Sequence, residues 1–216
     1  MNGLKNIECI SPGEIEKKSF EMISTELEKR KIILPAEEEM ITKRVIHTSA
    51  DFEYADTMTY SEGAVAAAQH LLSKGADIVT DTNMALAGIN KGALAKLGGE
   101  AHCFMADEDV AELAEKRGIT RAAVSMEKAM HIGKPVIFAV GNAPTALIRL
   151  YEMMQEGSFR PDFVIGVPVG FVNVEAAKEL IMETGVPCIV NRGRKGGSNI
   201  AAAVCNALLY GLVQRR

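Results

Sequence analysis

Residues 136–145 read Val136-Ile137-Phe138-Ala139-Val140-Gly141-Asn142-Ala143-Pro144-Thr145, an apolar run followed by a turn and a proline that can start a helix. The same order recurs downstream. Apolar residues 163–167 precede a helical stretch, and apolar residues 187–190 precede a glycine-rich turn and a final alanine-rich helix. A strand that is apolar on both faces has to be covered on both faces, which is typical of parallel sheets flanked by helices. The stretch therefore predicts an α/β fold.

Strands and helices continue to alternate on the N-terminal side of this stretch. Apolar residues 77–80 and 101–105 are predicted as two further strands, and residues 51–56, where aromatic and acidic residues alternate, as an exposed edge strand. Helical patterns come before residue 51. We expect one domain over residues 1–216 with a doubly wound, flavodoxin-like sheet. This sheet should be mostly parallel, with about five strands, helices on both faces and additional N-terminal helices.

The composition excludes several classes of protein. A formal net charge of −4 and a pI near 5.7 argue against general nucleic-acid binding, which usually needs a basic surface. The four cysteines are widely spaced, which favours reduced thiols over a disulfide framework. The sequence shows neither a signal-peptide pattern at its start nor a long uncharged apolar run. We expect a cytoplasmic protein that binds neither nucleic acid nor membrane.

Ligands of doubly wound sheets bind beyond the carboxyl ends of the strands. The most informative segment predicted at that edge is the basic turn, residues 191–198, which contains Arg192, Arg194 and Lys195 within an acidic protein. Gly196 lets the backbone approach a ligand closely, and Ser198 begins a helix whose free amides favour an anion. A carboxylate or phosphate ligand is one interpretation. A solvated basic turn that serves only as the entry to a helix is the other.

His47 is the candidate for proton transfer. It lies at the end of a predicted helix, and histidine is the side chain whose ordinary pKa lies closest to neutral pH. A structural role for it remains open at this point. The four histidines form no pair with the spacing of metal ligands, so no metal site is predicted. No Walker motif and no G-x-G-x-x-G motif occurs, which leaves nucleotide binding without support from a motif.

Six short segments, taken together and in order, resemble the precorrin-8X methylmutase family, which includes the cobalt-precorrin-8 methylmutases. The resemblance extends from about Ile15 to Leu212. The segments are Lys18-Ser19-Phe20, Arg44-Val45-Ile46-His47, Thr120-Arg121-Ala122-Ala123, Gly141-Asn142-Ala143-Pro144-Thr145-Ala146-Leu147, Gly166-Val167-Pro168-Val169-Gly170-Phe171-Val172 and Arg192-Gly193-Arg194-Lys195-Gly196-Gly197-Ser198.

The resemblance implies an isomerase that moves a methyl group from C-11 to C-12 of a corrin precursor in cobalamin biosynthesis. The product would be hydrogenobyrinic acid or, with cobalt, cobyrinic acid. It further implies a homodimer with active sites near the subunit interface. No organic cofactor is expected, and any cobalt would be carried by the tetrapyrrole substrate.

The resemblance also implies roles for individual residues. His47 matches the catalytic histidine of the family and is expected to protonate the macrocycle or donate a hydrogen bond to it. Ser19 and Arg121 match family positions that line the substrate, and Asn90, also expected to bind it, stands where other members have threonine. The loops at the strand ends supply the other expected substrate-binding residues, which are Asn142, Arg192, Arg194, Lys195, Gly196 and Ser198. Cations and backbone amides at helix starts would bind the substrate carboxylates. Met84, Ala85, Leu86 and residues 169–171 could form an apolar wall against the ring, or belong to the core.

Two functions from other classes remain as alternatives. One is a non-catalytic, flavodoxin-like domain that binds an anion or a nucleotide. The other is a structural subunit of an oligomer.

Overall fold

The computed structural model describes residues 10–213 and contains one six-stranded sheet in the order β1-β6-β5-β4-β2-β3. The strands are β1 (Met58–Tyr60), β2 (Asp77–Thr80), β3 (Ala101–His102), β4 (Val136–Val140), β5 (Phe163–Gly166) and β6 (Cys188–Asn191). Strands β2 to β6 are parallel to one another, and β1 pairs with β6 in the antiparallel sense. Without β1, the order is that of flavodoxin-like folds, which confirms the predicted fold class.

The central strand β4 shows why this part of the sequence decides the fold. All five of its residues are buried. Ile137 and Ala139 belong to the hydrophobic cluster on one face of the sheet, whereas Val136, Phe138 and Val140 belong to the cluster on the other face. Successive side chains of a strand point to opposite faces, so a strand without polar residues can be accommodated only between two layers of helices.

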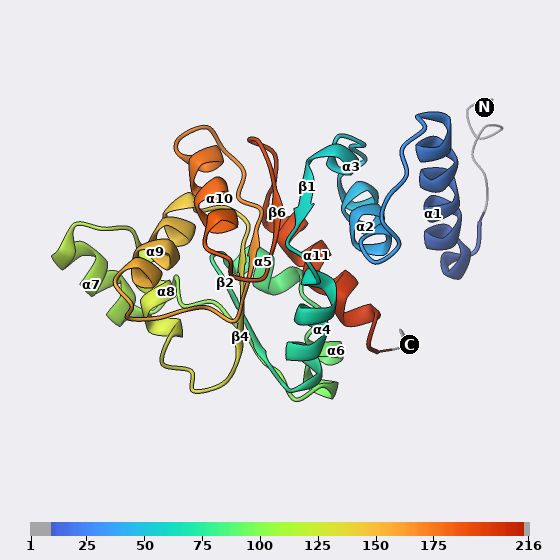
Figure 1. Cartoon of the computed structure of the whole chain (residues 1–216). Coiled ribbons are helices and arrows are strands. Elements are labelled where there is room, and N and C mark those ends of the chain that lie inside the picture. Colours follow the sequence, from blue (N-terminus) through green and yellow to red (C-terminus); the bar gives the residue numbers. More distant parts are fainter. Residues whose placement is uncertain (1–9, 214–216) are drawn as a thin grey trace, which may run out of the picture.

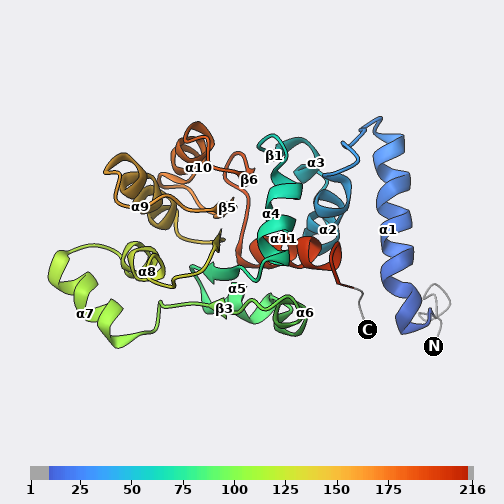
Figure 2. The same cartoon turned by 60° about the horizontal axis from the view of Figure 1, so that its bottom comes forward.

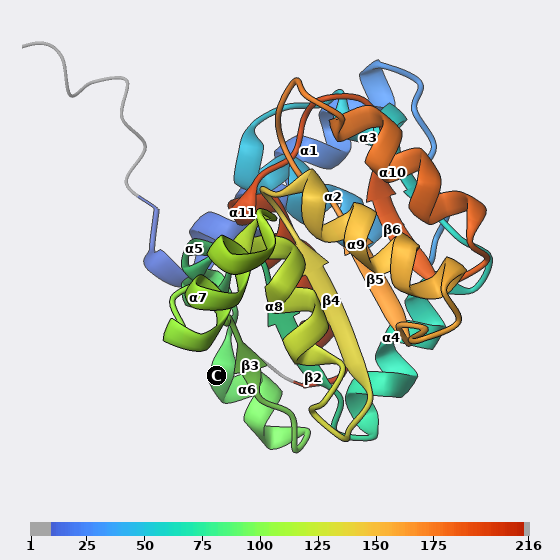
Figure 3. The same cartoon turned by 90° about the vertical axis from the view of Figure 1, so that its left-hand side faces the viewer.

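Different sets of helices cover the two faces of the sheet (Figures 1 and 3). Helices α8 (Arg121–Ala129), α9 (Pro144–Gln155) and α10 (Val174–Glu183) cover one face, with α7 (Glu108–Arg117) packed against α8. The other face is covered by α4 (Ala64–Ser73), α5 (Asn83–Gly88), α6 (Lys91–Lys96) and α11 (Ser198–Tyr210).

The N-terminal helices add a further layer outside α11. Helix α2 (Glu39–Ser49) packs on α11, and α1 (Pro12–Lys29) packs on α2 at the edge of the molecule (Figure 2). Within residues 10–213, no helix combines the length and the apolar character that crossing a membrane requires.

The edge strand is displaced from its predicted position at residues 51–56. This segment instead contains a turn and the short helix α3 (Tyr54–Thr57), and the edge strand β1 follows it. The backbone N–H of Glu53 donates to the Asp51 carboxylate at 3.0 Å, which favours a turn over an extended chain. Tyr54 is buried in the core cluster. The alternation of aromatic and acidic residues in this segment therefore belongs to a turn and a short helix and not to a strand.

Candidate active site

His47 lies in the last turn of α2, where its side chain is exposed. Ala50 ends the helix with a left-handed backbone conformation (φ 54°). A groove of about 620 Å³ separates α1 from this end of α2, and its lining is mainly apolar. Both His47 and Ser19 line this groove, so the structure brings these two predicted residues together. Other lining residues are Met22, Ile23, Ile46 and Phe52.

The imidazole of His47 is held by a ring contact. Its centroid lies 5.5 Å from that of Phe20 on α1, with the ring planes tilted by 35°. Among the described residues, no hydrogen bond or ion pair involves the His47 ring nitrogens, so both nitrogens are available to a ligand. The Ser19 hydroxyl donates to the Ile15 carbonyl oxygen at 2.9 Å and keeps its acceptor capacity. The groove therefore presents an imidazole and a hydroxyl oxygen to a ligand beside apolar surface.

The basic turn is already paired with carboxylates of its own chain. Arg192 Nε lies 3.6 Å from a Glu179 carboxylate oxygen, and Arg194 Nε donates to Glu175 on α10 at 3.1 Å. The Arg194 guanidinium also lies 5.7 Å from the centre of the Phe171 ring. These ion pairs are largely exposed, and exposed pairs are weak. A ligand carboxylate could therefore replace Glu175 or Glu179 at little energetic cost.

Lys195 connects the basic turn to the segment that follows His47. Its ammonium group donates to the Asp51 carboxylate and, at 2.7 Å, to Glu53. The hydrogen bond from Lys195 lowers the pKa of the Asp51 carboxyl below its ordinary value. Asp51 comes only four residues after His47, so the basic turn and the end of α2 meet at the same side of the molecule.

Two buried residues, Lys178 and Asn191, hold the basic turn in shape. Lys178 was not predicted, and Asn191 was part of the predicted turn without a role of its own. Lys178 on α10 is fully buried, and its ammonium donates to the carbonyl oxygens of Gly193 at 2.7 Å and Lys195 at 2.9 Å. Burial lowers the pKa of Lys178 to about 8. The Asn191 side-chain amide donates to the carbonyl of Lys195 at 2.8 Å and accepts from the Thr57 hydroxyl at 2.7 Å. Both residues fix backbone carbonyls.

Asp81 occupies the switch point of the sheet, between the ends of β2 and β4. Its buried carboxylate accepts hydrogen bonds from the backbone N–H groups of Gly141 (2.8 Å), Asn142 (2.8 Å) and Ala143 (2.6 Å). Burial raises the pKa of the Asp81 carboxyl above its ordinary value, although the three N–H donors act in the opposite direction. Substrate carboxylates would have to displace Asp81 to reach these amides.

The glycines at this edge are required by close packing between loops. A Cβ atom on Gly141 would lie 2.8 Å from the carbonyl oxygen of Gly197 and 2.8 Å from the Cα of Ser198. A Cβ on Gly196 would lie 2.1 Å from the Val167 carbonyl oxygen. The Ser198 hydroxyl shares a 2.7 Å hydrogen bond with Thr82. Gly196 and Ser198 thus have structural roles besides any contact with a ligand.

Neither Arg121 nor Asn142 lines the groove. Arg121 begins α8, and the Thr120 hydroxyl before it donates to that of Thr145 in the first turn of α9 at 2.9 Å. Helix α8 lies at the opposite end of the molecule from α1 in Figures 1 and 2. A single chain therefore does not bring Arg121 to His47.

Asn90 has a clear structural role at the start of α6. Its side-chain oxygen accepts from the Ala93 N–H at 2.9 Å, and its amide donates to the Tyr210 hydroxyl at 3.2 Å. The first contact is a helix N-cap, which serine, threonine, asparagine or aspartate can all provide. A threonine at this position would keep the cap and lose the second contact.

The proposed apolar wall is only partly formed as expected. Met84 on α5 (72% exposed) and Phe171 in the loop that follows β5 (82%) project into solvent. Ala85, by contrast, is fully buried in the core cluster, so of the two roles left open for it the core role holds. Its position on the inner side of the short helix α5 explains the difference.

Comparison with known proteins identifies the family. A family model described as precorrin-8X methylmutase matches residues 14–211. The chain belongs to this family. Membership makes it a methylmutase, an isomerase of cobalamin biosynthesis.

Named methylmutases match nearly the whole chain. The cobalt-precorrin-8 methylmutase of Priestia megaterium is 43% identical over 199 residues, which cover 92% of this chain and 88% of that protein. The Salmonella typhimurium protein of the same name is 42% identical, covering 93% of this chain and 96% of that one. The crystal structure of precorrin-8X methylmutase from Thermus thermophilus matches with a TM-score of 0.81 and 37% identity, covering 91% of this chain and 96% of that one.

Proposed function

We propose that this methylmutase moves the methyl group of precorrin-8X, or of its cobalt form, from C-11 to C-12, with His47 as the proton donor. The observation that carries the proposal is the position of His47, whose ring nitrogens are available in a largely apolar groove. The names of the relatives support the substrate class. Any cobalt belongs to the substrate, and the reaction needs no organic cofactor. The cytoplasmic location remains a prediction.

The groove suits the chemistry of such a substrate. Its apolar lining can contact the macrocycle, while Lys18 and Lys29 at its margin can interact with peripheral carboxylates. A proton from His47 would withdraw electron density from the ring system and so help the methyl group to migrate to the neighbouring carbon. Because the shift is intramolecular, positioning of the ring and of one proton can provide most of the catalysis.

The partner of this chain is proposed to be a second copy of itself. His47 and Ser19 lie at one end of the molecule, whereas α8, which Arg121 begins, lies towards the other. Exposed apolar side chains are present on α1 (Met22) and beyond the carboxyl ends of β2 and β5 (Met84, Phe171 and Val172). A homodimer in which the groove of one subunit faces the sheet edge of the other would unite both groups of residues.

The alternative of a phosphate-binding or nucleotide-binding flavodoxin-like domain is not favoured. In folds of this type the anion is bound at the switch point by backbone amides at the start of a helix. Here those amides, from Gly141 to Ala143, already donate to Asp81.

The reaction can be followed by absorption spectroscopy, since the shift changes the conjugation of the macrocycle. We expect the protein to convert precorrin-8X or cobalt-precorrin-8 under anaerobic conditions, and His47→Ala to lose at least about a hundredfold in kcat, as for loss of a general acid. His47→Ala should keep the melting temperature of the wild type because the side chain is exposed. Failure of the wild type to alter either spectrum would refute the proposed function.

The composite site can be tested by complementation. His47→Ala and Arg121→Ala are each expected to be inactive alone. If His47 and Arg121 act from different subunits, heterodimers formed by mixing them contain one intact site, and about a quarter of the wild-type activity returns, given random pairing of subunits. Absence of recovery, with heterodimers verified by mass spectrometry, would place both residues of each site in one subunit.

The basic turn is proposed to bind substrate carboxylates in exchange for its internal partners. Arg192→Ala and Arg194→Ala should weaken tetrapyrrole binding with little effect on folding. The matched control is Glu175→Gln with Glu179→Gln, which leaves both arginines without their internal partners and should strengthen binding. Unchanged affinity in both sets would show that the turn has no part in binding.

A further inference from the structure

Arg44 lies between two aromatic rings. The centre of its guanidinium is 5.1 Å from the Phe20 ring centre on α1 and 5.1 Å from that of Tyr210 at the end of α11. Only 11% of its side chain is exposed, and Nη2 donates to Glu16 at 2.7 Å. Two π faces and a carboxylate thus replace much of the water around this cation, a setting in which cation–π contacts are strongest.

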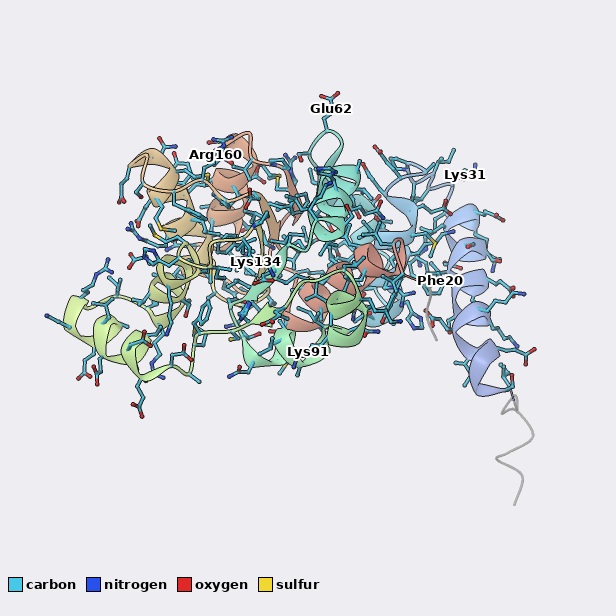
Figure 4. All side chains as sticks on the ribbon, turned by 90° about the horizontal axis from the view of Figure 1, so that it is seen from below. Phe20, Lys31, Glu62, Lys91, Lys134 and Arg160 are labelled. Atoms are coloured by element: carbon cyan, nitrogen blue, oxygen red, sulfur yellow. The ribbon has the colours of Figure 1, made fainter. Side chains whose placement is uncertain are left out.

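Phe20 also contacts His47. Arg44 and His47 are three residues apart on α2, so they project from neighbouring positions of one helical face. The Phe20 ring, which points from α1 towards the body of the molecule, reaches both of them (Figure 4). Tyr210, Arg44, Phe20 and His47 therefore form a continuous series of contacts, here called the aromatic stack, that joins α11, α2 and α1.

The stack matters because no hydrogen bond orients the His47 ring among the described residues. An exposed histidine can occupy several rotamers, whereas a general acid has to be within about 3 Å of the atom that it protonates. The contact with Phe20 limits these rotamers. Arg44, fixed by Tyr210 and Glu16, in turn limits the movement of Phe20.

We propose that Phe20 is a positioning residue that orients the His47 imidazole in the groove, and that Arg44 holds Phe20 in place through the aromatic stack. The proposal rests on the proposed function, in which His47 is the proton donor. It assigns no chemical step to Phe20 or Arg44. Their effect is on the fraction of molecules in which His47 points at the substrate.

Paired variants of Phe20 separate the ring from its apolar volume. Phe20→Leu removes the ring and is expected to lower kcat about tenfold with KM within twofold, as for a modest misplacement of a catalytic group. Phe20→Tyr keeps the ring and should retain activity close to that of the wild type. Arg44→Met should resemble Phe20→Leu, and Tyr210→Phe, which keeps its ring, should have no effect on kcat.

A second measurement does not depend on turnover. The His47 ring protons lie beside the Phe20 ring, so its ring current shifts their NMR signals. We expect these signals to move in Phe20→Leu and Arg44→Met and to stay in place in Tyr210→Phe. If Phe20→Leu does not fold, the Arg44→Met and Tyr210→Phe pair decides the question.

The outcomes distinguish this inference from the proposed function. An inactive wild type would refute the proposed function, while the NMR comparison would still decide whether the stack orients His47. An active wild type whose Phe20→Leu or Arg44→Met variant has the same kcat and the same His47 signals would overturn the positioning role. A kcat for Phe20→Tyr that is as low as that of Phe20→Leu would also overturn the positioning role, because Phe20→Tyr keeps the ring.

Discussion

Lys178 allows a quantitative test of how the basic turn is held. Its buried ammonium donates to two backbone carbonyls of that turn, and burial lowers its pKa from the ordinary 10.5 to about 8. The perturbation that we consider is Lys178→Met, which keeps an unbranched side chain of similar length and removes the titrating group. Comparison of the two proteins as a function of pH then isolates the contribution of one amine.

The sign follows from the proton balance. Between pH 8 and 10.5 the unfolded chain carries a proton on Lys178 that the folded chain has released, so the free energy of unfolding rises with pH. A fall in pKa from 10.5 to about 8 corresponds to about 3 kcal/mol, at about 1.36 kcal/mol per pH unit. Part of this rise in the free energy of unfolding occurs above pH 10, and solvent screening reduces the rest. About 2 kcal/mol is then expected between pH 7 and pH 10.

Urea unfolding of both proteins between pH 7 and pH 10 provides the measurement. Burial raises the pKa of Cys188, so this thiol also titrates differently in the folded and unfolded chains, but it does so in both proteins and its effect subtracts. We expect the stability of the wild type relative to Lys178→Met to increase by about 2 kcal/mol across the range, at equal m-values. A difference between the two proteins that stays constant with pH would refute the reasoning.

Three further predictions concern the loops at the sheet edge. Asp81→Asn should lower the free energy of unfolding by about 2–3 kcal/mol, because its amide group would face a backbone N–H that now donates to the carboxylate; a loss below about 1 kcal/mol in urea unfolding would contradict this. Gly141→Ala should destabilise by about 1–3 kcal/mol, because its Cβ would lie 2.8 Å from the Gly197 oxygen, and an unchanged melting temperature would exclude that contact. Lys195→Met should leave the melting temperature unchanged, because exposed ion pairs contribute little; a clear fall would show that this pair is structural.

Local sequence patterns were sufficient for the central sheet. Strands β4, β5 and β6 have no polar residue facing either helical layer until their last residues, so apolar runs alone located them. The edge of the sheet was harder. At residues 51–56 the alternating pattern has the period of a strand, but the hydrogen bond from the Glu53 N–H to the Asp51 carboxylate favours a turn. Strand β1 begins at Met58, seven residues later than predicted.

The candidate site was still harder to predict from the sequence, because its contacts join distant parts of the chain. Arg192, Arg194 and Lys195 were recognisable as a cluster, but their partners on α10 and after α2 depend on the tertiary fold. Lys178 looks like an ordinary surface lysine on an amphipathic helix, and Asp81 like one polar loop residue among several. Lys178 and Asp81 have their roles because they are buried. Their burial depends on how the helical layers pack on the sheet, which local sequence does not show.

The packing of α2 against α11 also has a consequence for the order in which the chain can fold. The helix that carries His47 is made early in synthesis, yet its main partner ends at Tyr210. Until α11 leaves the ribosome, α1 and α2 have an apolar face without its native cover. The parallel core strands can pair before that point, but the groove cannot be completed. Helices α1 and α2 are therefore synthesised before the sheet but can dock fully only after α11 follows it, so the sheet can form in a nascent chain while the candidate active site is still unassembled.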